Sequence, residues 1–371
     1  MKNILVTGAN GFIGKNLIEH LNRLENINIF KYDINNTEDE LEEFVLKADF
    51  IFHLAGVNRP KDESEFKKGN IDLTKKIIDF IVKANKNTPI LLSSSTQAKL
   101  DNPYGISKNC AEKEIFDYIK STNSKSYVYR LPNVFGKWSK PNYNSVVTTF
   151  CYNIANDLPI QINDPNTNLT LVYIDDVCEE FLNAFNGKSN TQDDGFSYVN
   201  NTYIISLKNL ADKLYIFKEI RKNLVMPGFS DEFTKKLYST WLSYLDISNL
   251  SYELEMKRDN RGWLSEFIKS KEFGQVFVSS TKQGVTRGNH WHHTKVEKFL
   301  VISGDAVIKF RNINTDEKLE YRVSGCNLEV VDIPVGYTHS VTNIGDNELI
   351  TLFWANEIFD FNKSDTYYLE V

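Results

Sequence analysis

The stretch GNHWHHTKVEKFLVISG holds three of the six histidines of the chain, and a glutamate follows them closely. Imidazoles that cluster in this way either bind a metal ion or transfer protons. Side chains alternate between the faces of a β-strand, so His290 and His292 point to one side while Trp291 and His293 point to the other. His290 and His292 are therefore expected to act together, and His293 to be a surface or packing residue. A metal-free site, in which the histidines only make hydrogen bonds, is the alternative.

A second candidate for chemistry is the pair Tyr104 and Lys108, four residues apart in NPYGISKNCAEKEIF. This segment has a helical pattern, which places both side chains on one face. An ammonium near a phenol lowers the pKa of the phenol, and the phenol can protonate a carbonyl oxygen as hydride arrives at the carbon. The serines of LLSSS, just upstream, can hydrogen-bond the same oxygen. These residues predict a carbonyl reductase if a nucleotide-binding fold precedes them.

Such a fold is indicated by GANGFIG, which follows a short apolar strand and opens a helix. Glycines at these positions permit a tight turn and let a pyrophosphate reach the N–H groups at the helix N-terminus. An ordinary turn between a strand and a helix is the alternative. The cofactor contacts expected in this loop are Gly8, Asn10, Gly11, Phe12, Ile13 and Gly14.

Asp33 ends the second predicted strand, where an acid can bind a hydroxyl of the adenosine ribose. The same carboxylate would repel the 2′-phosphate of NADP. A turn aspartate with no role in cofactor binding is the alternative. Asp33 therefore leaves the choice between NADPH and NADH open.

The elements that position these residues change character along the chain. Up to about residue 187, short strands such as NILV, INIFKYD, DFIFHLAG and PILLSSS alternate with helical segments, which predicts a doubly wound parallel sheet of the Rossmann type. Residues 206–245 have a mainly helical pattern, interrupted at Pro227 and Gly228. From about residue 246, short strands separated by turns predict an all-β barrel or sandwich. We expect two domains, residues 1–245 and 246–371.

Composition narrows the class of protein. A chain of 371 residues exceeds the usual size of a single core, and its formal net charge of −6 argues against a nucleic-acid partner. It has no run of 18 apolar residues and begins with a strand, so neither membrane insertion nor a signal peptide is expected. Four scattered cysteines favour a reduced, cytoplasmic protein.

Six motifs, GANGFIG, HLAGVN, SSS, YGISK, RLPNVFG and YIDDV, follow one another in the order found in the extended short-chain dehydrogenases that act on nucleotide-activated sugars. The chain resembles this family up to about residue 245. The resemblance implies a catalytic set of Ser95, Tyr104 and Lys108, with Ser94 as the alternative serine. It also implies cofactor contacts from the HLAG segment and from the catalytic helix, at Leu54, Ala55, Gly56, Tyr104 and Lys108.

The same resemblance implies that residues around Asn133 and Gly136 line the sugar-nucleotide cleft. The chain departs from the family at two places. Only eight residues separate Ser95 from Tyr104, so the loop between them is shorter than usual. NLTLVYIDDV also lacks the arginine with which many relatives contact the pyrophosphate.

In the second domain, the spacing of Gly284, His290, His292, Glu297 and Gly304 resembles the first motif of the cupins. PVGYTHSVTN resembles the second, with Leu328 where a leading glycine is expected. The resemblance implies a barrel with three imidazoles and one carboxylate facing its interior. This donor set suits Zn²⁺, and also Mn²⁺ or Fe²⁺. The implied ligands are His290, His292, Glu297 and His339.

DNRGWLSEF followed by TRGNH resembles another family, the metal-free deoxysugar-nucleotide 3,5-epimerases. There the histidine of the second segment removes a proton beside a ketone, a role that would fall to His290. One imidazole cannot be both a metal ligand and a free base. We favour the ligand, because His292 and Glu297 of the metal motif are both present.

The complete order of segments is similar to the bifunctional reductases of capsular polysaccharide precursor synthesis. This resemblance implies a Rossmann reductase fused to a zinc cupin, a homodimer and the use of NADPH. The implied reaction converts UDP-2-acetamido-2,6-dideoxy-hexos-4-ulose to UDP-2-acetamido-2,6-dideoxy-L-talose, on the route to N-acetyl-L-fucosamine. The substrate would be a UDP-activated 4-keto-6-deoxy amino sugar.

The chemistry of such a ketosugar explains why the two domains share a chain. The C3 hydrogen is acidic only while C4 is a ketone, so epimerisation at C3 must precede reduction at C4. Tyr337, beside His339, is a candidate for proton transfer in the barrel, with a metal-bound water as its rival. Three alternatives remain: a barrel used only for docking or dimerisation, a redox-sensing NADP-binding module, and an iron dioxygenase.

Overall fold

The computed structural model describes residues 1–254, 257–259, 262–264, 268, 274–357 and 361–371. This part of the chain divides into two compact units, residues 1–145 with 168–205, and residues 146–167 with 206–371. The predicted boundary after residue 245 concerns where the Rossmann-type and helical segments end and the barrel strands begin along the sequence. It stays a prediction. None of the described helices combines the length and apolar content that crossing a membrane requires.

The first unit is built on a five-stranded parallel sheet in the order β2-β1-β3-β4-β5. Its strands are β1 (Lys2–Thr7), β2 (Ile27–Tyr32), β3 (Phe50–His53), β4 (Ile90–Ser95) and β5 (Tyr127–Leu131). Central strands such as β3 are buried along their whole length, because helices cover both faces of the sheet. The strand order reverses between β1 and β3, where ligands bind in open α/β sheets.

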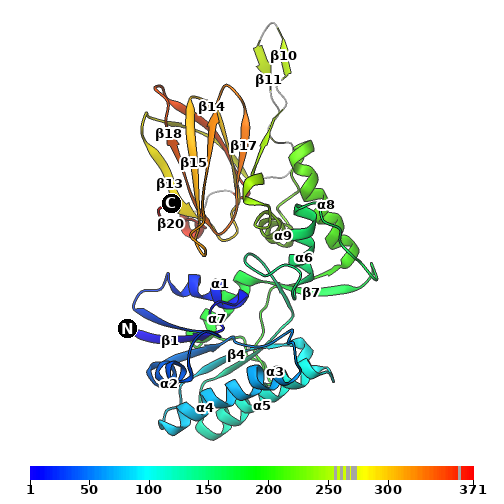
Figure 1. Ribbon diagram of the computed structural model, residues 1–371, viewed down its shortest axis with the longest axis vertical. Coiled ribbons are helices and arrows are strands. Elements are labelled where there is room, and N and C mark those ends of the chain that lie inside the picture. The colour runs from blue at the N-terminus through cyan, green and yellow to red at the C-terminus, as the bar shows by residue number, and fades with distance from the viewer. Residues whose placement is uncertain (255–256, 260–261, 265–267, 269–273, 358–360) are drawn as a thin grey trace. The chain divides into compact units, whose positions relative to one another are not determined.

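Helices flank both faces of this sheet, with α2, α4 and α5 on one side and α1 and α7 on the other (Figure 1). They are α1 (Phe12–Leu21), α2 (Glu38–Lys47), α4 (Leu73–Lys83), α5 (Pro103–Thr122) and α7 (Ile174–Phe185). Helix α2 begins with a reciprocal cap between Thr37 and Glu40. The predicted doubly wound Rossmann-type sheet is confirmed.

Smaller elements complete this unit. The short helix α3 (Ser64–Phe66) continues into a π-helix over Lys67–Asp72, and a 3₁₀-helix spans Thr96–Lys99. A three-stranded sheet joins β6 (Asn133–Phe135), β7 (Asn168–Tyr173) and β8 (Thr202–Ser206). The shortened loop before Tyr104 is thus the 3₁₀-helix and the Asn102 cap of α5.

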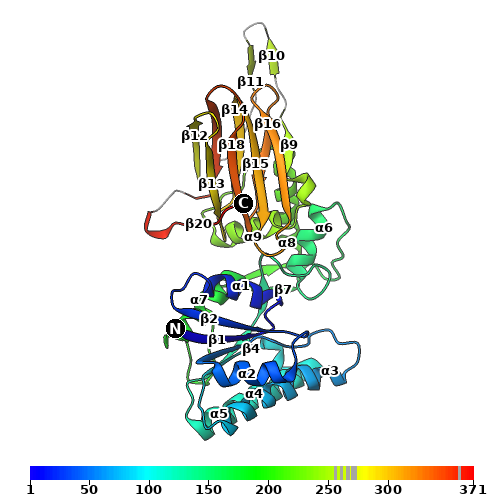
Figure 2. The ribbon, with the colours of Figure 1, turned by 60° about the vertical axis from the view of Figure 1, so that its left-hand side comes forward.

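The second unit contains two five-stranded antiparallel sheets, in the orders β12-β19-β14-β17-β9 and β16-β15-β18-β13-β20 (Figure 2). The strands are β9 (Ser251–Glu253), β12 (Gln275–Thr281), β13 (Thr286–Trp291), β14 (Glu297–Ser303), β15 (Asp305–Asn312), β16 (Lys318–Ser324), β17 (Glu329–Ile333), β18 (Tyr337–Asn343), β19 (Leu349–Ala355) and β20 (Tyr367–Tyr368). Side chains from both sheets, such as Phe299, Ile308 and Val341, form the core. The predicted all-β domain of the cupin type is confirmed.

Further described elements of this unit are a β-hairpin, a 3₁₀ turn before β9, a 3₁₀ turn between β19 and β20, and three helices. These are β10 (Lys257–Asp259), β11 (Gly262–Leu264), the turns Ile247–Asn249 and Phe361–Lys363, and α6 (Val146–Ala155), α8 (Leu207–Asn223) and α9 (Glu232–Leu242). The helices predicted for residues 206–245 are confirmed as α8 and α9, and the interruption at Pro227 and Gly228 lies between them. Leu224, which ends α8, packs with Leu254, Leu300 and Val330 beside the barrel.

Candidate active sites

A cleft of about 720 Å³ lies within the first unit, and the glycine-rich loop forms part of its wall. Many of the residues predicted to contact cofactor line this cleft: Gly8, Asn10, Gly11, Phe12, Ile13, Gly14, Leu54, Gly56, Tyr104 and Lys108. Ala55 and Asp33 are not among its lining residues. No aspartate or glutamate lines the cleft in the described part of the chain, which suits anionic ligands.

The glycine-rich loop approaches its neighbours too closely for side chains. Gly8 has a φ of +66°, and a Cβ there would lie 2.7 Å from the backbone nitrogen of Ala55. A Cβ on Gly14 would lie 2.2 Å from the carbonyl oxygen of Gly8. Helix α1 starts at Phe12 without a side-chain cap and without an acid in its first turn, so its N–H groups remain available to an anion. The loop therefore fits the pyrophosphate of a dinucleotide.

Asp33 is tied to this loop. Its Oδ2 accepts a hydrogen bond from the N–H of Asn10 at 2.7 Å, and its Oδ1 accepts one from the N–H of Ile34 at 2.8 Å. The carboxylate thus holds both the glycine-rich loop and its own turn. These contacts are those of a turn residue, and a role of Asp33 in binding the ribose or in the choice of cofactor stays a prediction.

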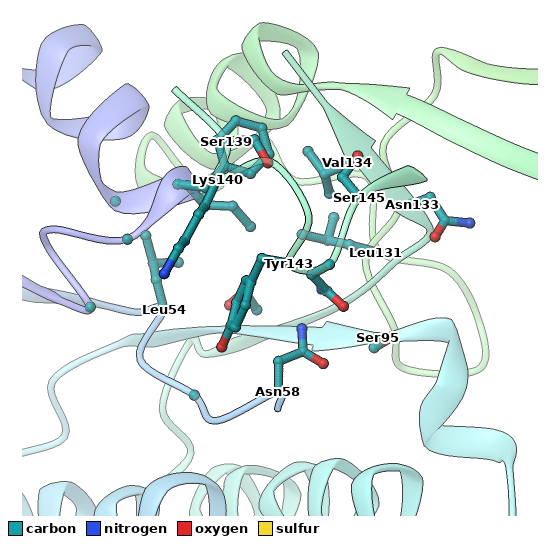
Figure 3. Close-up of a pocket in the computed structure, with 18 of the residues that line it drawn as sticks. Leu54, Asn58, Ser95, Leu131, Asn133, Val134, Ser139, Lys140, Tyr143 and Ser145 are labelled. Atoms are coloured by element: carbon teal, nitrogen blue, oxygen red, sulfur yellow. The ribbon is translucent and has the colours of Figure 1, made fainter. Parts of the chain in front are cut away.

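The catalytic set predicted from the sequence meets at the cleft. Ser95 ends β4, Tyr104 and Lys108 lie on α5, and all three side chains line the cleft. The Ser95 side chain lies near enough to Tyr104 to lower the pKa of its phenol slightly, against the larger effect of burial. Figure 3 shows Ser95 at the edge of the cleft. Asn133, also predicted from the resemblance, lines the same cleft.

The neighbouring serine has a different environment. Ser94 is buried, and its Oγ donates to Glu112 Oε1 at 2.5 Å. Glu112 also accepts two hydrogen bonds from Arg130, at 3.0 and 2.6 Å. Since Ser94 belongs to this buried network, the geometry favours Ser95 as the serine that faces a substrate.

The expected lowering of the Tyr104 pKa by Lys108 is not what the structure indicates. Burial raises the pKa of Tyr104, and the nearby Ser95 side chain only opposes this rise. Burial also lowers the pKa of Lys108 to about 8, and its Nζ donates to the carbonyl oxygen of Ser93 at 2.7 Å. The ammonium is thus engaged with the backbone, while the protonated phenol suits a proton donor.

Residues 136–145, which we call the cleft loop, contribute a further wall through residues 138–140 and 143–145. Gly136, which the resemblance placed at the sugar-nucleotide cleft, begins this loop but is not among the lining residues. Gly136 has a φ of +148°, and a Cβ there would lie 2.2 Å from Ile174 Cγ2. Buried Lys137 anchors the loop by donating to Asp175 at 2.9 and 3.1 Å. Trp138 has a φ of +69°, which is costly for an aromatic residue and is typical of functional loops.

Two side chains of the cleft loop face the cleft. Figure 3 shows Lys140 and Tyr143 extending into it from the same loop. The Nζ of Lys140 lies 5.5 Å from the centre of the Tyr143 ring. The spacing of residues in the segment FGKWSKPNYNSV gives no sign that a lysine would enter the cleft.

In the second unit, His290, His292, Glu297 and His339 come together, as predicted; we call them the metal-ligand cluster. One ligand atom from each lies within 4.8 Å of the others. The Nε2 atoms of His292 and His339 are each 3.4 Å from Glu297 Oε2. His290 lies in β13, His292 follows that strand, Glu297 begins β14 and His339 lies in β18.

A β-bulge sets the register of this cluster. The pairing of β13 with β18 shifts between Gly288 and His290, which brings His290 opposite His339. Gly288 has a φ of +102°, and a Cβ there would lie 2.8 Å from the carbonyl oxygen of His339. The alternation of side chains along a strand predicts that His290 and His292 share a face, but it does not predict this bulge. His293 instead packs against Trp291, with ring centres 4.5 Å apart.

The electrostatics of the cluster suit a divalent cation. Burial is the main influence that lowers the pKa of His290, to about 3, and the pKa of His339 is lowered as well. Burial alone would raise the pKa of Glu297, but His292 and His339 outweigh it and hold this pKa well below its usual range. The Nε2 atoms of His292 and His339 are buried without a hydrogen-bond partner among the described residues. Imidazole nitrogens without a hydrogen-bond partner beside a carboxylate fit a metal ion.

Tyr337 lies on β18 two residues before His339, so both side chains point to the same face. It packs against the core between the sheets, and burial raises its pKa. A phenol in this state is a proton donor at neutral pH. The motif DNRGWLSEF, from which a proton-abstracting role for His290 was considered, lies mostly outside the described residues.

Comparison with known sequences finds matches over both parts of the chain. The NAD dependent epimerase/dehydratase family matches residues 4–196, and the polysaccharide biosynthesis C-terminal domain matches residues 257–367. The UDP-2-acetamido-2,6-beta-L-arabino-hexul-4-ose reductase of Pseudomonas aeruginosa is 44% identical over 365 residues, 98% of this chain and 97% of that protein. The spore coat polysaccharide biosynthesis protein SpsL of Bacillus subtilis is 22% identical over 29% of this chain and 78% of its own length.

Solved structures give a consistent result. The capsular polysaccharide assembling protein CapF of Staphylococcus aureus covers all of both chains with 50% identity and a TM-score of 0.69. UDP-glucuronic acid 4-epimerase of Bacillus cereus, in complex with NAD, covers 58% of this chain and 84% of its own, with 18% identity and a TM-score of 0.53. The second likeness shows a shared fold alone.

Proposed function

This chain belongs to the NAD dependent epimerase/dehydratase family and to the family of the Pseudomonas aeruginosa reductase, and from that premise we propose a two-step reaction on a UDP-activated sugar. The barrel inverts C3 of UDP-2-acetamido-2,6-dideoxy-hexos-4-ulose, and the Rossmann unit then reduces the C4 ketone. The product is UDP-2-acetamido-2,6-dideoxy-L-talose, a precursor of N-acetyl-L-fucosamine for capsular polysaccharide. The observation that carries the reductase step is the meeting of Ser95, Tyr104 and Lys108 beside the glycine-rich loop in one cleft without a carboxylate.

The reductase step assigns one task to each side chain. Ser95 and Tyr104 donate hydrogen bonds to the C4 carbonyl oxygen, and the Tyr104 phenol transfers its proton to that oxygen. Lys108 holds its position through Ser93 and keeps a positive charge beside the reacting groups. The cofactor, held on the glycine-rich loop and at Leu54 and Gly56, supplies the hydride when bound.

Lys140 supports binding of the sugar diphosphate. Strand β7, NLTLVY, has no cation where many relatives carry the pyrophosphate-binding arginine. Besides Lys140, the lysines that line the cleft are Lys15 in α1 and Lys108, which is 6% exposed. A cation that enters the cleft from outside the glycine-rich loop can neutralise the diphosphate of the sugar nucleotide. We assign that role to Lys140.

The epimerase step belongs to the barrel. The metal-ligand cluster would hold a divalent cation, Zn²⁺ in preference to Mn²⁺ or Fe²⁺, which would supply Lewis acidity beside the C4 carbonyl. Tyr337, on the same face as His339, is the candidate that returns a proton to C3. Because the proton at C3 is acidic only beside a ketone, this step comes first.

One experiment tests both steps on the full chain. The 4-keto sugar nucleotide is followed by NMR in D₂O, first without and then with NADPH. We expect deuterium at C3 before any reduction, and the L-talo product only after NADPH is added. Reduction with no deuterium at C3 would leave a reductase whose barrel serves only for docking or dimerisation.

Comparing kcat/KM for NADPH and NADH decides the cofactor, for which we favour NADPH. The homodimer and the cytoplasmic location stay predictions.

A further inference from the structure

Residues 365–369 run beside the strand that carries His290; we call them the C-terminal strap. Tyr367 and Tyr368 form β20, which pairs with Trp291 and His290 of β13. The N–H of Leu369 donates to the carbonyl oxygen of Asn289 at 2.9 Å. The strap is therefore bonded to the edge of the sheet beside the metal-ligand cluster.

Asp365, at the start of the strap, binds the turn between β13 and β14. Its Oδ1 accepts from the N–H of His293 at 2.9 Å, and its Oδ2 accepts from the N–H groups of Thr294 and Lys295 at 2.7 and 2.6 Å. The Thr294 hydroxyl donates to the same Oδ2 at 3.0 Å. Three consecutive backbone donors aimed at one carboxylate form an anion-binding nest, which fixes the chain between His292 and Glu297.

The main chain of Asp365 makes a second contact, directly with a member of the cluster. Its carbonyl oxygen lies 2.5 Å from Nδ1 of His292. A carbonyl oxygen can only accept, so Nδ1 carries a proton, and in the neutral imidazole the lone pair is then on Nε2. That Nε2 is the atom 3.4 Å from Glu297 Oε2. One residue therefore fixes both the tautomer of His292 and the turn that leads to Glu297.

We propose that Asp365 is a positioning residue of the metal site, which acts by holding His292 in its ligating tautomer and orientation. This inference rests on the proposed metal site and adds a residue that lies far from the ligands in sequence. Loss of the partner of a metal-bound histidine typically changes metal affinity by about 10- to 100-fold. Here the partner is the main-chain carbonyl of Asp365, and the Asp365 side chain holds that carbonyl in place through the N–H groups of residues 293–295. If Asp365 only stabilised the fold, its replacement would lower the stability of the protein and leave the properties of the bound metal unchanged.

The test compares the full chain with D365A, D365N and the control E370Q. Glu370 lies just beyond the strap and is exposed, and among the described residues its side chain accepts only from the Tyr368 hydroxyl. Metal-free proteins are titrated with Zn²⁺ against a chromophoric chelator, and their Co²⁺ forms are compared by visible absorption. Thermal unfolding of the metal-free proteins reports stability separately.

We expect D365A to bind Zn²⁺ about 10- to 100-fold more weakly and to shift the Co²⁺ spectrum. D365N, whose amide oxygen can still accept, should lie between D365A and the wild type, and E370Q should match the wild type. Zn²⁺ affinity in D365A within twofold of the wild type overturns the inference, as does an equal loss in E370Q.

Two further outcomes are decisive. If D365A does not fold, D365N and ¹⁵N NMR of His292 in the wild type carry the test, and a neutral His292 with its proton on Nε2 instead of Nδ1 contradicts the proposal. If the wild type itself binds no Zn²⁺, the proposed metal site fails and this inference fails with it. That result is distinct from a wild type that binds Zn²⁺ and a D365A variant that binds it equally well.

Discussion

The reductase cleft is a space of about 720 Å³ with a glycine-rich loop as one part of its wall, whereas the metal-ligand cluster consists of four side-chain atoms within 4.8 Å of one another. In the cleft, glycines at positions 8 and 14 matter because no Cβ fits. In the cluster, His292 and His339 matter because their buried Nε2 atoms find no other partner in the described chain. Damage to one site should therefore leave the other intact, and the two should respond to different changes.

The largest expected effect separates the two activities. Tyr104→Phe removes only the phenolic proton, so reduction should fall by about 10²- to 10⁴-fold while cofactor binding is retained. Exchange of deuterium into C3 should continue, because the ketone survives in this variant. NMR for C3 and NADPH absorbance for reduction measure both rates. Turnover near that of the wild type would falsify the role of Tyr104.

The next effect concerns the barrel. His290→Ala combined with His292→Ala should empty the metal site, which elemental analysis measures. Thermal unfolding should shift downward, since a ligand present at about 100 times its dissociation constant stabilises the folded state by about 2.7 kcal/mol. NADPH affinity should be unchanged. His293→Ala is the matched control and should keep its metal, because His293 packs against Trp291 outside the cluster.

A smaller effect is expected at the cleft loop. Lys140→Met removes the positive charge that we assign to the sugar diphosphate, which should raise KM for the sugar nucleotide about tenfold. The dissociation constant for NADPH should change little. Lys83→Met, at an exposed position at the end of α4, is the control. A loss of NADPH affinity with an unchanged KM for the sugar would instead assign Lys140 to the cofactor.

The smallest effect is a pH dependence confined to the reductase. Burial lowers the pKa of Lys108 to about 8, so the side chain is charged below this pH and loses its proton as the pH rises through it. The kcat/KM for reduction should accordingly fall above about pH 8. Deuterium exchange at C3 should not share this step. A reduction profile that stays level up to pH 10 would contradict a role for the Lys108 charge.

The sequence predicted features that depend on local spacing. Tyr104 and Lys108 share a helix face, and His290 and His292 are two residues apart, so both pairs were identified. The choice between Ser94 and Ser95 needed the buried network around Glu112, which only the folded chain reveals. Asp365 could not be predicted, because it is far from His292 in sequence and makes its key contact through the backbone.

The pKa values and the charges that line the cleft were harder to predict from the sequence. A lysine four residues from a tyrosine was expected to lower the pKa of the phenol, but burial of Tyr104 has the larger effect and raises it. Likewise, the segment that holds Lys140 has no spacing typical of a binding motif, and it reaches the cleft because the buried pair of Lys137 and Asp175 fixes the loop. Burial and loop conformation are properties of the fold that spacing does not encode.

The division of the chain into compact units has a consequence for how this enzyme can diversify. The backbone passes between the two units three times, after residues 145, 167 and 205. A single recombination event near residue 245 would therefore transfer the barrel strands without α6, α8 and α9, which belong to the same unit. The apolar contact of Leu224 with Leu254, Leu300 and Val330 would be lost in such a hybrid. New pairings of reductase and barrel are thus expected to arise by point substitution at the two sites more readily than by exchange of whole domains.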